Sequence, residues 1–204
     1  MQKEDSKDTK ISKLPLNGFG QAGQTPYTYQ KVSIKVTLTA IFTALAIGTS
    51  YILAPLINIE VMSVILFIAG FLYGKYIGMV VGLTSSLIYY GWNPFGVPPL
   101  PLYLVCVGCM TFIGLIGGIL KPNQNPLQKL EITRLNIAKI ALIGFLYTFL
   151  FDLTTNIVYG WVYYSGNILL AFITGFPFMI IHLVNNTIMF ALLVLPTYKA
   201  VTAL

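Results

Sequence analysis

The chain has 204 residues, of which 56% are hydrophobic and only 9% are charged, and its mean hydropathy is +0.79. A soluble domain needs a polar surface that this composition cannot supply, so a lipid bilayer is the expected solvent. The formal net charge of +6 does not indicate a nucleic-acid partner, because the basic residues are spread over a tail and several connections.

Residues 1–30 are polar and rich in Lys, Gly, Gln and Thr. They hold too few apolar side chains to offset the entropy of ordering, which predicts a polar cytoplasmic N-terminal tail. The first apolar run begins only after Lys35, so no cleavable signal peptide is expected. Residues 31–204 are predicted to form one membrane-embedded domain.

This domain is predicted to be an all-α integral membrane protein, a bundle of six transmembrane helices. A helix needs about 20 residues to cross about 30 Å of hydrocarbon. The expected spans are 36–54, 61–73, 77–92, 102–120, 137–159 and 168–195. The second and third are short for a full crossing, and the turn "YGKYIG" separates them.

Charge predicts the orientation of these spans. The twelve Lys and Arg residues occur in the tail, beside the turn at Lys75, around the connection from Lys121 to Lys139, and at Lys199. They all fall on one side of a six-span protein, and that side is predicted to be cytoplasmic, with both termini. The expected location is the cell membrane, as a multi-pass protein in contact with lipid.

The outward connections "PLINIE", "NPFGVPPLP" and "YGWVYYSGN" contain no Lys or Arg. They hold Trp92, Trp161 and Tyr159, whose rings suit the interface between lipid and water. Anchoring in the interface and stacking on a ligand remain open for these rings. Glu60 and Asn93 stand at the same level, either around the mouth of a pocket or in ordinary contact with water.

Polar side chains also lie inside the predicted spans. Asp152, Asn156 and Tyr159 share one helical stripe that runs toward the outer boundary. Asp152 either contacts a substrate in a wet cavity or locks helices together through His182 or Asn185, and the direction of the stripe favours substrate. His182 and Asn186 belong to a second inward stripe on the last span. With one His in the chain, no metal site and no cofactor are expected.

Small residues form another pattern. Ala40, Ala44 and Gly48 are four residues apart, so that another backbone can approach this stripe closely. The alternative is packing within the bundle. Cys106 and Cys109 form a C-x-x-C pair with no second ligand pair nearby, which favours packing over a redox or metal site.

The stretches "TAIFTALA", "LFIAGFLYGKYIGMVVGLTSSL" and "FDLTTNIVYG" resemble substrate-binding S components of energy-coupling factor (ECF) transporters, from about residue 35 to the C-terminus. The resemblance implies high-affinity capture of a vitamin or related micronutrient, followed by docking on a transmembrane T component and two ATPase subunits. In that family the Ala-x-x-x-Ala face, here Ala40 and Ala44, contacts the T component. The chain has no G-x-x-x-x-G-K-[ST] sequence, so ATP hydrolysis is expected on separate subunits.

Two other functions stay open from the sequence. A self-sufficient secondary carrier or channel is one, although no paired repeats are demonstrable. An intramembrane enzyme is the other, with Asp152, His182 and a hydroxyl of Thr84, Ser85 or Ser86 as candidate groups. No G-x-S-x-G or H-E-x-x-H stretch supports it, and no catalytic residue is expected.

Overall fold

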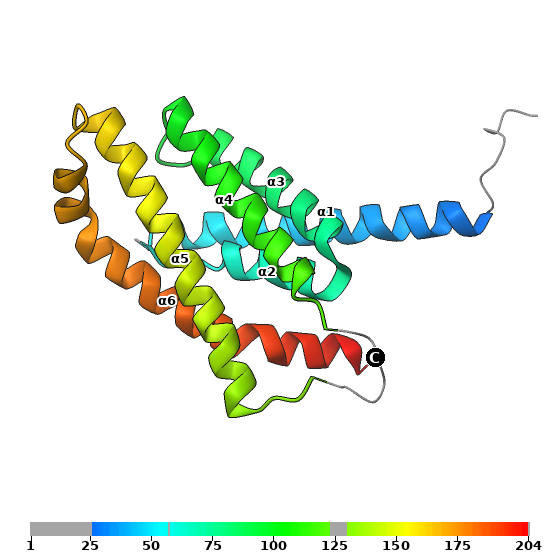
Figure 1. Cartoon of the computed structure of the whole chain (residues 1–204). Helices are drawn as coiled ribbons and strands as arrows, with labels where there is room; N and C mark the ends of the chain where they lie inside the picture. The colour runs from blue at the N-terminus through cyan, green and yellow to red at the C-terminus, as the bar shows by residue number, and fades with distance from the viewer. Residues whose placement is uncertain (1–25, 57, 123–129, 204) are drawn as a thin grey trace, which may run out of the picture.

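The computed structural model describes residues 26–56, 58–122 and 130–203, which fold into helices joined by short connections (Figure 1). The helices are α1 (Pro26–Leu53), α2 (Met62–Tyr73), α3 (Lys75–Gly91), α4 (Leu100–Ile119), α5 (Arg134–Tyr163) and α6 (Ile168–Thr202). The described residues contain no strand, and the all-α prediction is confirmed. Of these helices α1, α4, α5 and α6 are long and apolar enough to cross a membrane.

The helix ends differ from the prediction mainly at the two termini. α1 begins at Pro26, so the last residues of the segment predicted as a tail are helical, while residues 1–25 lie outside the described part. α6 continues to Thr202 and contains Pro177 and Pro196. Proline removes a hydrogen bond within a helix, and Figure 1 shows that α6 changes direction along its length.

The turn predicted within "YGKYIG" is present and is very tight. Gly74 ends α2 and precedes the first residue of α3, Lys75, and its φ is +101°. This backbone conformation strongly favours glycine, because at such a φ a Cβ atom would be strained against the adjoining backbone, although the space around Gly74 is open. The sharp turn separates the 12 residues of α2 from the 17 of α3.

α2 forms the centre of the bundle. Its residues from Met62 to Leu72 are all buried, as expected for a helix that is apolar on every side. The Phe67 ring lies 5.2 Å from that of Phe190 on α6 and 5.5 Å from that of Phe71. The contact between Phe67 and Phe190 joins α2 to α6.

Glycines bring α2, α3 and α4 into backbone contact. A Cβ atom on Gly78 would collide with the backbone of Gly114, and one on Gly70 would meet the same carbonyl. A Cβ atom on Gly117 would collide with the backbone at Phe67. These contacts hold the first half of α3 directly against α4, while the cavity described next lies near the last turn of α3.

Candidate functional site

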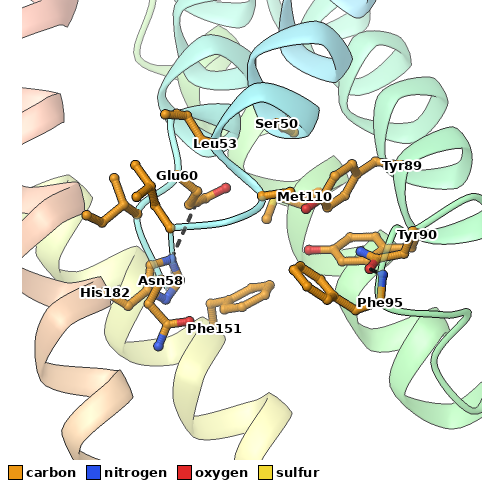
Figure 2. A pocket seen from close by; sticks show the side chains of 14 residues that line it. Ser50, Leu53, Asn58, Glu60, Tyr89, Tyr90, Phe95, Met110, Phe151 and His182 are labelled. Carbon is orange, nitrogen blue, oxygen red and sulfur yellow. Dashed lines mark hydrogen bonds and ion pairs between the residues drawn. The ribbon is translucent and has the colours of Figure 1, made fainter.

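A cavity of about 450 Å³ opens where the end of α1 and the 54–61 connection meet α3, α4, α5 and α6 (Figure 2). This volume is in the range of small-molecule sites, about 300 to 1,000 Å³. Its lining residues are Ser50, Leu53, Ala54, Leu56, Asn58, Ile59, Glu60, Tyr89, Tyr90, Asn93, Phe95, Met110, Phe151 and His182.

The 54–61 connection is held in place by amides. Asn58 has a positive φ of 56°, which asparagine tolerates better than most residues, and its side-chain nitrogen donates to the carbonyl of Phe178 at 2.7 Å. Asn185 donates to the backbone carbonyl of Glu60 at 2.9 Å. Both bonds tie the connection to α6, so that the Glu60 side chain reaches the cavity.

Two carboxylates flank the imidazole of His182. Its Nδ1 lies 2.8 Å from Oδ1 of Asp152, and its Nε2 lies 3.4 Å from Oε1 of Glu60. When Asp152 is ionised it only accepts hydrogen bonds, and in that state Nδ1 of His182 is the donor. Asp152 thereby fixes the ring and leaves its Nε2 edge toward Glu60 and the cavity.

Asn186 completes this polar cluster from one turn further along α6. Its side-chain nitrogen is 3.0 Å from Oγ1 of Thr148, 3.1 Å from Nε2 of His182 and 3.3 Å from Oε1 of Glu60. Asn186 is fully buried. It supports the cluster from behind, because it is absent from the residues that line the cavity.

Aromatic rings form the other side of the cavity. Figure 2 shows Tyr89, Tyr90 and Phe95 facing Glu60 and His182 across the cavity, with Phe151 between the two groups. The ring centroids of Tyr89 and Tyr90 are 5.3 Å apart. The Phe151 and His182 rings pack edge to face, with their centroids 5.7 Å apart. One end of the cavity is thus aromatic, while the other offers hydrogen-bonding groups.

Three of the predicted substrate-binding residues line this cavity, namely Glu60, Asn93 and His182. Asp152 and Asn186 lie behind His182 and contact it. The structure thus supplies the helix-locking partner that the sequence left open, since Asp152 bonds to His182 rather than to Asn185. Direct contact of Asp152 with substrate stays a prediction.

The remaining predicted residues lie away from the cavity lining. Asn156 donates to the backbone carbonyl of Asp152 at 2.7 Å, and the Tyr159 ring is 4.4 Å from that of Tyr163. Trp92 and Trp161 are 73% and 66% exposed, which suits rings that anchor in an interface.

Sequence reasoning missed the aromatic lining. The run from Tyr89 to Phe95 showed only that rings gather near an outward connection. Phe151 stands beside Asp152, but one helical step separates the directions of their side chains by about 100°. Which of them faces a cavity depends on where the neighbouring helices lie.

The small-residue stripe of α1 is on the surface. Ala40, Ala44 and Gly48 are exposed, and a Cβ atom on Gly48 would meet nothing within 4 Å. The alternative of packing within the bundle is therefore wrong for this stripe.

The two cysteines form no disulfide. Cys106 is buried, and the sulfur of Cys109 lies 3.7 Å from the Thr154 hydroxyl oxygen, so both thiols lie at contacts between helices.

Comparisons with known proteins give one informative match. No curated protein matches the chain, and no solved structure matches it. The family model described as "ECF-type riboflavin transporter, S component" matches residues 31–201. This family consists of membrane-embedded substrate-binding subunits of transporters, which rules out the enzyme alternative. Because the match covers the membrane domain almost completely, the chain belongs to the family of ECF-type riboflavin transporter S components.

Proposed function

We propose that the chain binds riboflavin, or a vitamin with a similar fused planar ring, in the cavity beside Glu60 and His182. The observation that carries the proposal is the division of this cavity into an aromatic side and a hydrogen-bonding side. Riboflavin divides in the same way, into a flat ring system and polar groups, namely an imide and a hydroxylated chain. High affinity is expected because such a site encloses most of its ligand.

The lining residues support specific roles. Phe151, Tyr90 and Phe95 offer ring surfaces for offset stacking. Glu60 accepts hydrogen bonds from an imide or hydroxyl group, and the Nε2 edge of His182 is the second polar contact. Asp152 contributes through the orientation of His182.

Direct titration tests this proposal. The purified protein in detergent is titrated with riboflavin, and binding is followed through quenching of the flavin fluorescence and by calorimetry. We expect one site per chain, with saturation at submicromolar ligand. Absence of quenching and heat at ligand concentrations well above this range would remove riboflavin as the ligand.

We further propose that the chain serves ATP-driven uptake and does not transport alone. The exposed stripe of Ala40, Ala44 and Gly48 supports docking on a T component, which brings two ATPase subunits. The chain itself lacks a phosphate-binding G-x-x-x-x-G-K-[ST] loop. Riboflavin uptake is measured in cells that express the chain with and without those subunits. We expect uptake only when the T component and ATPases are present, whereas a self-sufficient carrier would take up riboflavin in both kinds of cell.

The proposed topology has six crossings, both termini in the cytoplasm and the cavity open to the outside of the cell membrane. In Figure 1 the α3–α4 and α5–α6 connections lie on one side, while the α2–α3 turn and the C-terminus lie on the other, where Lys75 and Lys199 are found. α2 and α3 are about 18 and 26 Å long at 1.5 Å per residue. Labelling of single cysteines at Ser165 and Tyr76, in a chain with Cys106 and Cys109 replaced by Ser, tests the sidedness. Only the cysteine that replaces Ser165 should react with a reagent added from outside the cell.

A further inference from the structure

We propose that the cavity discriminates by charge, accepting neutral riboflavin and rejecting its 5′-phosphate ester. This inference rests on the proposed function and names the ligand class more narrowly. It follows from the two carboxylates beside His182 and from the lack of Lys and Arg among the residues that line the cavity.

The polar end of the cavity carries net negative charge. Glu60 lines the cavity, and Asp152 stands directly behind the imidazole of His182. The cluster holds two carboxylates but only one imidazole, which contributes at most one positive charge. With both carboxylates ionised, at least one negative charge remains in either protonation state of His182. In a cavity with low dielectric, this charge acts over most of the ligand's length.

No cation compensates for it. None of the residues that line the cavity is Lys or Arg. The sequence of the connections at this end, residues 54–61, 92–99 and 164–167, also contains neither. The lysines that flank the described helices, such as Lys75 and Lys199, lie at the opposite helix ends. Turning the ligand end for end therefore brings a phosphate to no Lys or Arg side chain.

The neutral donors of the cavity are insufficient for a phosphate. The hydroxyls of Tyr89 and Tyr90 and the amides of Asn58 and Asn93 are uncharged. A phosphate monoester carries about −1.5 to −2 charge at pH 7. Removing such a charge from water without a cation is costly, whereas a hydroxyl needs only one or two neutral partners.

Three ligands test the inference on the purified wild-type protein. They are riboflavin, riboflavin 5′-phosphate and riboflavin 5′-acetate, which is enlarged at the same position but neutral. We expect the phosphate to bind at least about tenfold more weakly than riboflavin and the acetate to bind within about threefold of it.

Equal binding of riboflavin and its phosphate would overturn the inference and leave the proposed function intact. Equal weakening by both esters would assign the rejection to size and would also overturn it. Failure of riboflavin itself to bind would remove the proposed function, and the charge inference with it.

Two variants test the source of the charge. Glu60→Gln should reduce the ratio of phosphate to riboflavin dissociation constants by about fivefold or more. Glu131→Gln, which removes an exposed carboxylate before α5, should leave the ratio unchanged. If Glu60→Gln fails to bind either ligand, Asp152→Asn is the second measurement, and it should lower the same ratio. A ratio that does not change in the binding variants would contradict the role of these carboxylates.

Discussion

Nδ1 of His182 lies 2.8 Å from the Asp152 carboxylate, and this hydrogen bond joins α6 to α5 at the wall of the cavity. Asp152 is 7% exposed, and the second oxygen of its carboxylate has no hydrogen-bond partner in the structure. A buried carboxylate with one strong bond is costly unless that bond is kept. Under the proposed function, we expect Asp152 to be a positioning residue, whose effect on the ligand passes through the imidazole.

Asp152→Asn should weaken riboflavin binding by about five- to twentyfold, because the hydrogen bond from residue 152 to His182 would no longer be charge-assisted. Calorimetry on the purified variant measures the change, and a melting curve checks that the fold is retained.

A double-mutant cycle checks the route of this effect. In a His182→Gln background, Asp152→Asn should change the riboflavin dissociation constant little, since the group that Asp152 orients is already gone. Full additivity of the two substitutions would show that Asp152 acts on the ligand independently of His182.

Phe151→Ala should cost about 1 to 3 kcal/mol of riboflavin binding, the usual range for loss of a stacking ring. Phe149→Ala is the matched control on the same helix, because Phe149 is 39% exposed and absent from the cavity lining. Fluorescence titration compares the two variants. Equal losses would mean that general loosening of α5, and not stacking in the cavity, causes the effect.

Ala44→Trp should prevent assembly with the T component while leaving riboflavin affinity within about twofold, because the indole fills a surface where two backbones are expected to meet closely. Leu45→Trp, on the neighbouring face of α1, is the control, since Leu45 is also exposed, at 49%. Co-purification with the T component and ATPases reports assembly. Normal recovery of the Ala44→Trp complex would remove this stripe from the interface.

Gly114→Ala should destabilise the bundle by about 1 to 3 kcal/mol or prevent folding, because its methyl group would collide with the backbone of Gly78. Gly108→Ala on the same helix has open space for the methyl group and should have little effect. Thermal unfolding in detergent measures both. Similar melting temperatures for the two variants would contradict the close backbone contact between α3 and α4.

The sequence by itself determined the helical class and most helix positions, because hydropathy and helix breakers act locally. The span expected at 102–120 appears as α4 (Leu100–Ile119), and the turn at "YGKYIG" appears at Gly74. The sequence also singled out Glu60 and His182, since polar groups are rare in such a chain and need partners.

Only the tertiary structure decided which side chains meet. Asp152 bonds to His182 and not to Asn185 because of the rotation of α5 against α6, which no local pattern specifies. The same rotation directs Phe151 into the cavity, while the position of Trp161 leaves its ring outside. A helical period fixes which residues share a face, but only packing against other helices decides what that face contacts.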